Sequence, residues 1–529
     1  MPLSSRRARL ALALLFLLAF ALGLAGIDFG YHWDEINLLR SARASYRSGS
    51  LLPGWYNYPS VTFDLTLLSS LPQAVEVIRQ ERGVNTINPL FYLREARGLY
   101  REINARLDPF TFPPQMRPLF LFITLLTGIW TYALARELLK SRAAGLLAAA
   151  LLFSSWEFAY HARWGAPDGL LAQFGALTVW LTLRAAAPQS KCPAAWLTLA
   201  AISAALACGS KYYGGLFLLP VLLTALALAR RLGWSKTKLG LSLLALGLVF
   251  AAAFLLATPG VLLETQQFIH DIRFEMRHYS TFHYGQTVAP GGEHWGLLLI
   301  YFALTAFSRF APLAALIFVL ALAGAFSLLT RPADRLRLTL VFGVPLLYVF
   351  YMGLQRVLIV RNYLALFPFF AVLAAGGAQM LWRSRLFQTR RAQWFFGLAV
   401  FAALSANFGW QAYAAQSIQR RGEISLSACL RQVTESRPQT RFFLSPQARA
   451  ALAGADFPNQ APTPASADIF LYVSGEIKHP LISNRYGVYE TPCGPYELNF
   501  NYYPDWEGDP RLVALKMSEA RAEPLVGEK

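Results

Sequence analysis

The sequence predicts a polytopic α-helical membrane protein of about eleven transmembrane helices, followed by a small C-terminal α/β domain. First, hydrophobic residues make up 55% of the 529 residues and charged residues only 15%, whereas a soluble domain carries about 25% charged residues. Second, the apolar residues are gathered in blocks long enough to cross a bilayer. Third, these blocks stop near residue 414. The 38 Phe, 13 Trp and 4 Cys exclude a disordered chain, a collagen and a disulfide-rich scaffold.

The basic excess lies in the apolar part of the chain. The formal net charge is +18, and residues 415–529 contain 12 basic and 13 acidic side chains, so residues 1–414 carry the whole excess. Short Lys/Arg clusters between apolar blocks are typical of cytoplasmic loops of membrane proteins. A nucleic-acid-binding surface is the alternative explanation for a high isoelectric point. It fits poorly because the basic residues stand in small groups, and we expect no nucleic-acid partner.

The apolar blocks predict the spans in order. Arg6, Arg7 and Arg9 precede the first block, which predicts a cytoplasmic N-terminus; the block is either an uncleaved anchor, which we favour, or a signal peptide. Gly296–Phe310 is either a short span or a surface helix, and only a surface helix leaves every short basic cluster on one side. The eleven predicted spans are Leu10–Ile27, Leu119–Leu139, Ala143–Tyr160, Gly165–Leu183, Ala194–Gly209, Tyr212–Ala229, Leu239–Thr258, Ala311–Leu329, Leu338–Met352, Tyr363–Trp382 and Trp394–Ala414.

Two polar segments of the transmembrane domain, residues 1–414, are predicted on the outer side. The large first loop, residues 28–118, contains two amphipathic segments, Glu35–Ser48 and Pro89–Leu107, which are typical of helices lying along a membrane surface. An aromatic, His-rich loop covers residues 259–295.

Residues 415–529 have the composition of a soluble domain, which we expect on the outer, periplasmic side. The sequence predicts a helix at Ser425–Val433 and strands at Arg441–Leu444 and Ile469–Val473. Cys429 and Cys493 are either disulfide-bonded or two free thiols, with equal weight.

Several ionisable residues stand at the outer ends of predicted spans. Such groups are costly near a bilayer and usually face a cavity or a partner. Snorkelling of the side chains toward water is the alternative explanation. Convergence at one membrane level favours a site, and the residues concerned are Glu157, Arg163, Asp168, Lys211 and Arg361.

An acidic pair, Asp34 and Glu35, opens the first outer loop directly after the first span. A carboxylate there can remove a proton from an acceptor hydroxyl. Lys and Arg at the same level can stabilise a phosphate leaving group. The pair therefore suggests acid/base chemistry on an anionic, lipid-borne substrate, although an acidic pair can also simply keep a loop soluble.

The segment from His278 to Gly285, which includes His283, is rich in aromatic and His residues. It can line a sugar subsite or pack as an ordinary loop. Its spacing fits no zinc motif, so we expect no structural metal, and a divalent cation remains a possible cofactor. Motifs for nucleotide binding are absent from the sequence.

The pattern resembles the GT-C superfamily of polyprenyl-phosphate-sugar glycosyltransferases. The likeness covers roughly residues 1–415 and is greatest for the branch of protein O-mannosyltransferases and the lipid A aminoarabinose transferase. The motifs that carry it are Asp34-Glu35, Asn57-Tyr58-Pro59, Arg163 with Pro167-Asp168, Gly209-Ser210-Lys211-Tyr212-Tyr213-Gly214, Pro259-Gly260 with Arg277-His278-Tyr279, and Arg361-Asn362-Tyr363-Leu364.

The resemblance implies an inverting glycosyltransferase in the bacterial inner membrane, with a periplasmic active site and a polyprenyl-phosphate sugar donor. Asp34 matches the catalytic base, with Glu35 as the alternate. Two phosphate ligands of the aminoarabinose branch are replaced here, one by Asn37 and one by Tyr58-Pro59-Ser60. Donor phosphate binding is therefore expected from Lys211, Arg361 and Arg163, and substrate contacts from Asp168, His278, His283, Tyr58 and Tyr363.

The acceptor is expected to be a lipid, polysaccharide or protein of the cell envelope. Two alternatives remain: a transporter or flippase of a lipid-linked sugar, and a polymerase or ligase of envelope polysaccharide. Repeat symmetry and broken helices in matching halves would favour the transporter, and neither is visible in the sequence.

Overall fold

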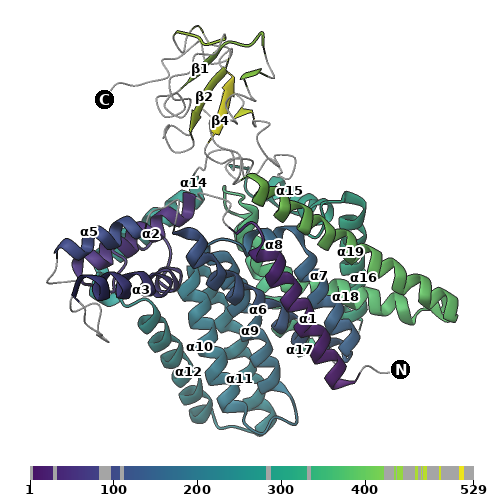
Figure 1. Ribbon diagram of the computed structural model, residues 1–529. Helices are drawn as coiled ribbons and strands as arrows, with labels where there is room; N and C mark the ends of the chain where they lie inside the picture. The colour runs from purple at the N-terminus through teal and green to yellow at the C-terminus, as the bar shows by residue number, and fades with distance from the viewer. Residues whose placement is uncertain are drawn as a thin grey trace.

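The protein is a helical bundle with a small β-sheet beyond one of its ends (Figure 1). A computed structural model describes residues 4–27, 33–82, 97–107, 112–281, 287–330 and 335–421, together with segments 434–435, 438–444, 459–462, 466, 469–473, 488–489 and 512–516.

Within these residues, 10 helical segments are long and apolar enough to cross a membrane, which confirms the polytopic class. Each coincides with one of the predicted spans. They are α1 (Ser5–Leu24), α6 (Pro113–Leu139), α9 (Pro167–Ala186), α10 (Pro193–Ser210), η1 with α11 (Tyr212–Phe217 and Leu218–Leu232), α12 (Lys236–Ala257), α16 (Ala311–Leu329), α17 (Arg335–Gly353), η3 with α18 (Val360–Leu366 and Phe367–Arg383) and α19 (Arg390–Arg421).

The predicted span Ala143–Tyr160 is divided in the structure into α7 (Arg142–Ser154) and α8 (Trp156–His161). Ser155 causes the division. Its backbone is extended, its Oγ accepts from the Phe158 amide at 3.4 Å, and the same hydroxyl donates to the Ala306 carbonyl at 2.7 Å. Ser155 therefore ends one helix and caps the next, and the predicted span ran through it because a serine within a mostly apolar run does not by itself end a helix.

The ambiguous piece Gly296–Phe310 corresponds to α15, which covers Gly292–Leu304. Its 13 residues extend about 20 Å at 1.5 Å per residue, less than the roughly 30 Å hydrocarbon core. The α15 helix contacts α16 and α17.

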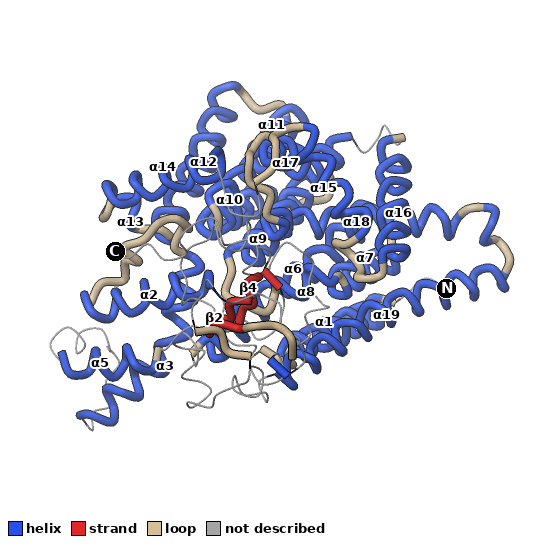
Figure 2. The backbone as a smooth tube through the Cα atoms, turned by 90° about the horizontal axis from the view of Figure 1, so that it is seen from above, coloured by secondary structure: helices blue, strands red, loops and turns tan. Residues whose placement is uncertain are grey.

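The helices of the two outer loops lie together on one side of the bundle (Figures 1 and 2). The predicted surface helix at Glu35–Ser48 is α2 (Trp33–Ser48), and the C-terminal part of Pro89–Leu107 is α5 (Arg97–Arg106); residues 83–96 lie outside the described part. Between them runs α3 (Val61–Arg82), and the later outer loop forms α13 (Gly260–Leu263) and α14 (Thr265–Thr281). Buried Leu39, Tyr46, Phe63, Val77 and Ile103 give α2, α3 and α5 a small core of their own.

The bundle is tightly packed around α9, α10 and the α16–α18 pair. Of the α9 span, 72% is buried, and α9 contacts both α6 and α10. Gly324 of α16 faces the α18 backbone at Leu373 and Gly377, where a Cβ atom would clash. Small residues permit this close approach of two membrane helices. By contrast, only 6% of each of the α12 and α19 spans is buried within the protein.

The sheet follows α19, which continues to Arg421 beyond the predicted domain boundary at 414. Its strand order is β1 (Phe442–Leu444), β2 (Ile469–Val473), β4 (Leu512–Lys516) and β3 (Val488–Tyr489). Strands β1 and β2 are parallel, with Phe442 opposite Ile469, and the other pairs are antiparallel. Both predicted strands are confirmed. The predicted helix Ser425–Val433, Cys429 and Cys493 lie outside the described residues.

Candidate active site

A buried contact joins the N-terminus of α9, the C-terminus of α10 and η3. Asp168 is in the first turn of α9 directly after Pro167, and Lys211 is the extended C-cap residue of α10. The Lys211 ammonium donates to Asp168 Oδ1 at 2.6 Å and to Asn362 Oδ1 at 2.6 Å. The α9 helix dipole adds to the stability of a negative charge at Asp168.

Arg361 connects this contact to the first outer loop. Its Nη1 donates to Asp34 Oδ2 at the start of α2, and its Nε lies 3.8 Å from Asp168 Oδ2. The guanidinium also lies over the Trp164 ring, 5.3 Å from the ring centre. Two cations and two carboxylates, all at most 4% exposed, thus form one set that we call the charge cluster: Asp34, Asp168, Lys211 and Arg361.

Tyrosines surround the charge cluster. The Lys211 ammonium lies 5.3 Å from the ring centre of Tyr213 and 5.9 Å from that of Tyr58. Tyr279 of α14 exchanges weak hydrogen bonds with the Asn362 amide at 3.3 and 3.4 Å, and the Tyr348 hydroxyl donates to the Asn362 carbonyl at 2.7 Å. Asn362 is therefore fixed from both its side chain and its backbone.

The loop that carries Tyr58 is fastened to α13 and α14. The Tyr56 amide donates to Asp271 Oδ2 at 2.7 Å, and the Tyr56 hydroxyl donates to Glu264 Oε2 at 2.5 Å. The side-chain amide nitrogen of Asn57, Nδ2, donates to Glu275 Oε1 at 2.6 Å. These contacts hold one wall of the site against the outer helices.

The electrostatic surroundings favour a carboxylate that accepts protons readily. Burial raises the pKa of Asp34 above its usual value, although the Arg361 guanidinium opposes this shift. Burial also raises the pKa of Glu275 and holds the pKa of Tyr58 well above its usual range. Tyr58 is consequently a neutral hydrogen-bonding group at physiological pH.

Glu35 faces away from the charge cluster and is paired with Arg117 of α6. Arg117 Nε and Nη2 donate to the two Glu35 oxygens at 3.0 and 2.6 Å. The Gly165 amide donates to Glu35 Oε1 at 2.8 Å, and Arg117 Nη1 donates to the Ile27 carbonyl at 2.7 Å. Glu35 therefore fastens α2 to α6 and to the turn before α9.

Sequence reasoning missed Arg117, although the residue was visible as an isolated Arg at the start of an apolar block, in Gln115-Met116-Arg117-Pro118. A buried Arg in such a place requires an anionic partner. Asn362 and Tyr279 stand in motifs that carry the resemblance but were not predicted as members of the site, and Glu275 was missed because nothing in the local sequence of α14 distinguishes it from an ordinary acidic residue.

Arg163, expected near the donor phosphate, bonds to the end of α1. Its Nη1 and Nη2 donate to the Ala25 and Leu22 carbonyls at 3.0 and 2.8 Å. Carbonyls at a helix C-terminus have no partner within the helix, and Arg163 satisfies two of them. Burial lowers the pKa of Arg163 to about 10, so the side chain is still charged at neutral pH.

Two of the remaining predicted substrate residues, Tyr363 and His278, occupy different places. The Tyr363 hydroxyl forms a buried hydrogen bond with His294 Nε2, and His294 Nδ1 lies 2.9 Å from the Gln355 carbonyl. The His278 ring stacks on Phe274 and meets Tyr279 edge-on, with ring centres 6.1 and 5.8 Å apart. His283 lies outside the described residues. Among the residues that the structure describes, we find no group of His, Cys, Asp and Glu that could hold a metal ion.

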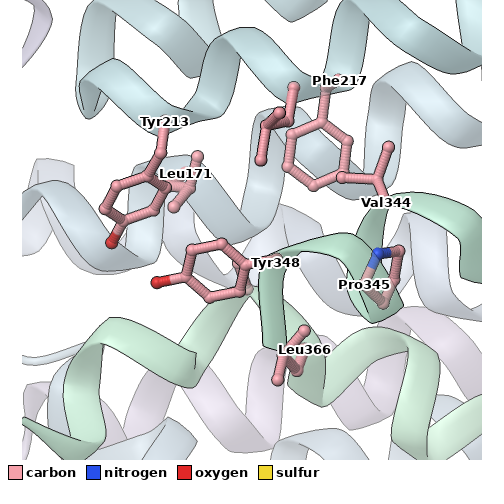
Figure 3. A pocket seen from close by; sticks show the side chains of 9 residues that line it. Leu171, Tyr213, Phe217, Val344, Pro345, Tyr348 and Leu366 are labelled. Carbon is pink, nitrogen blue, oxygen red and sulfur yellow. The ribbon is translucent and has the colours of Figure 1, made fainter. Parts of the chain in front are cut away.

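An apolar pocket lies behind the tyrosines, between α9, η1, α17 and η3 (Figure 3). Tyr213 and Tyr348 place their hydroxyls at one edge of it, away from Phe217 and Pro345. The two rings therefore separate the charge cluster from the apolar interior.

The fold is of the GT-C type, as the resemblance implied. The chain is similar to the structure of ArnT from Cupriavidus metallidurans bound to undecaprenyl phosphate, with a TM-score of 0.50, 12% sequence identity, and coverage of 97% of this chain and 99% of that chain. It is also similar to the oligosaccharyltransferase of Archaeoglobus fulgidus, with a TM-score of 0.49, 12% identity, and coverage of 92% and 70%.

A match between part of the sequence and a protein family adds to this. Residues 86–274 match the family of dolichyl-phosphate-mannose-protein mannosyltransferases. The matched part includes Asp168 and Lys211 and excludes Asp34 and Arg361. No curated protein matches the chain by sequence.

Proposed function

We propose that the protein is an inverting glycosyltransferase that moves a sugar from a polyprenyl-phosphate donor to an acceptor of the cell envelope at the periplasmic face of the inner membrane. The observation that carries the proposal is the charge cluster, in which two buried cations and two buried carboxylates meet where several spans end. The GT-C fold and the mannosyltransferase match support the same class of reaction.

Lys211 and Arg361 are the proposed ligands of the donor phosphate. Their charges stabilise a phosphate leaving group without protonating it, as cations do in phosphoryl recognition. Lys211 stands between α10 and η1, and Arg361 stands in η3, so rigid spans hold both. Arg163 is assigned to the end of α1 instead, because both of its terminal nitrogens already bond there.

Asp34 is the proposed general base. A single displacement requires that the acceptor hydroxyl lose its proton as it attacks the anomeric carbon from the face opposite the phosphate, and inversion follows. Burial raises the pKa of Asp34, which strengthens it as a proton acceptor. Glu35 is held by Arg117 and Gly165 and is assigned a structural role.

Substrate contacts are proposed for the groups at the rim of the charge cluster. Tyr58, Tyr279 and Glu275 present neutral or weakly acidic oxygens that can bond to sugar hydroxyls, and His278 lies beside Tyr279. Tyr363 is proposed to stabilise the site by its hydrogen bond to His294 and not to contact the substrate. His283 is retained as a proposed sugar contact on the sequence alone.

The direct test is a transfer assay with the purified full chain, a polyprenyl-phosphate sugar and an extract of envelope acceptors. Release of free polyprenyl phosphate is the expected result, and Lys211→Ala should slow it at least 100-fold because a buried phosphate ligand is lost. Lys238→Ala is the matched control, since Lys238 stands in the first turn of α12, at the opposite end of this helix from Ala257, and lies over Trp234. Movement of intact donor across the membrane without release of lipid phosphate would indicate a flippase and overturn the proposal.

A further inference from the structure

Both cations proposed to bind the donor phosphate are paired with carboxylates of the protein. Asp168 Oδ1 accepts from Lys211 at 2.6 Å, and Arg361 contacts Asp34 Oδ2 and lies 3.8 Å from Asp168 Oδ2. The charge cluster therefore holds two positive and two negative charges. A phosphate that enters it must replace a carboxylate on at least one cation, because a third anion among buried groups is costly.

The two carboxylates differ in how they are held. Asp168 uses one oxygen for each cation and projects from the first turn of α9, a span that is 72% buried. Asp34 belongs to α2, outside the spans, and its Oδ2 accepts from Arg361. The adjacent Glu35 is fixed by Arg117, so α2 can stay in place while the Asp34 side chain changes rotamer. Asp34 is accordingly the carboxylate that can leave.

We propose, building on the function proposed above, that Asp34 occupies the place on Arg361 that the donor phosphate takes, so that donor binding releases the general base. Asp168 is the positioning residue that keeps Lys211 and Arg361 together before and after the exchange. Donor therefore binds before the acceptor is activated, and a site without donor has no free base with which to activate water or an acceptor.

The transfer step returns the charge to the same cations. The acceptor oxygen forms a bond to the anomeric carbon while the bond from that carbon to the phosphate oxygen breaks, and the electron pair of the broken bond stays on the phosphate. The acceptor proton goes to the Asp34 carboxylate. One negative charge has then moved from Asp34 to the leaving phosphate. Lys211 and Arg361 lie beside both the Asp34 carboxyl group and this phosphate. When Asp34 loses its proton to water it can pair with Arg361 again, which favours release of the lipid phosphate.

The exchange predicts opposite changes in binding and turnover for one substitution. Asp34→Asn keeps the size of the side chain and removes the charge that competes for Arg361. Binding of undecaprenyl phosphate should become at least 10-fold tighter, equal to about 1.4 kcal/mol, while turnover falls about 10²–10⁴-fold with loss of the base. Asp34→Ser, which also removes the charge, should bind in the same way and serves as the second variant.

Four controls isolate the exchange. Glu137→Gln removes one negative charge far from the site. Glu137 pairs with Arg184, which lies about 24 Å from Asp168 along the axis of α9. The affinity for undecaprenyl phosphate should stay unchanged. Arg361→Ala in combination with Asp34→Asn should abolish the gain. Undecaprenol, which lacks the phosphate, should bind all variants equally. Asp168→Asn should weaken phosphate binding and Asp168→Glu should restore part of it, a rescue that only a positioning role explains.

The measurement is titration of undecaprenyl phosphate into the purified full chain in micelles, followed by native mass spectrometry. Tighter binding to Asp34→Asn and Asp34→Ser, dependent on Arg361, supports the exchange. Unchanged or weaker binding to both, with intact binding and turnover in the unsubstituted protein, overturns the exchange and leaves the proposed function standing. Absence of phosphate-dependent binding in the folded, unsubstituted protein overturns both.

Discussion

Replacement of Glu35 by Ala should destabilise the protein through Arg117 rather than through the reaction. The carboxylate is 1% exposed and the guanidinium side chain 0%. The substitution removes both Arg117–Glu35 hydrogen bonds, at 3.0 and 2.6 Å, and the bond from the Gly165 amide at 2.8 Å. Breaking a buried ion pair by removing one partner costs about 3–5 kcal/mol, because a charge is left without compensation.

This cost converts into a measurable change in melting temperature. At about 2.1 cal/mol/K per residue, the unfolding entropy of 529 residues is about 1.1 kcal/mol/K, so Tm should fall by about 3–5 °C. The assay is thermal unfolding of the purified full chain in detergent, followed by tryptophan fluorescence. Glu35→Gln keeps the shape of the side chain and one acceptor oxygen, and its Tm should fall by less.

Two comparisons test the reasoning. The double variant Glu35→Met with Arg117→Met removes both charges, and its Tm should recover part of the loss, because a well-packed apolar pair can replace a buried ion pair. At a temperature where it is folded, Glu35→Gln should retain turnover, unlike Asp34→Asn. If Glu35→Ala keeps the original Tm but loses turnover, the structural role is refuted and Glu35 becomes the candidate base.

Three further predictions concern the pH profile, the end of α1 and the topology. A base works only when ionised, and burial raises the pKa of Asp34. The value of kcat/KM should therefore decrease as the pH falls through a value above the usual Asp pKa of about 3.9. A decrease that begins only at or below that value would contradict a raised pKa of Asp34. Arg163→Ala should lower Tm, since two buried helix-end carbonyls lose their donor at about 1–3 kcal/mol, and loss of donor affinity with unchanged Tm would return Arg163 to the phosphate site. Protease added to intact spheroplasts should remove the region after Arg421, and complete protection would reverse the proposed orientation.

The sequence predicted that the residues of the charge cluster converge, which the structure agrees with, but it did not predict their pairings. Asp34, Lys211 and Arg361 each stand at the end of an apolar block, so their depth could be predicted from the blocks alone. Their partners could not, because the Arg361–Asp34 contact joins residues 327 positions apart and the Lys211–Asn362 contact joins residues 151 positions apart. Only the packing of the spans decides which of these groups meet.

The adjacent residues Asp34 and Glu35 also show that contact partners could not be predicted from the sequence. Asp34 and Glu35 are indistinguishable as an acidic pair, yet they point to different partners on η3 and α6. Successive side chains of a helix lie about 100° apart around its axis, which separates the two roles. Arg163 was grouped with the phosphate ligands because it precedes Asp168 closely, whereas the position of α1 decides its bonds. The division at Ser155 was hidden because a hydroxyl within an apolar run does not by itself end a helix.

The wide separation of the charge cluster along the chain has a consequence for biogenesis. A ribosome produces Asp34 first and Arg361 327 residues later, at about 5–20 residues per second. For an interval of roughly 16–65 seconds at that speed, the growing polypeptide has inserted Asp34 and then the Lys211–Asp168 pair without the guanidinium that completes the set. The nascent membrane protein consequently completes the charge cluster only when η3 and α18 enter the bilayer, and a translation product that stops before them lacks Arg361, one of the two proposed phosphate ligands.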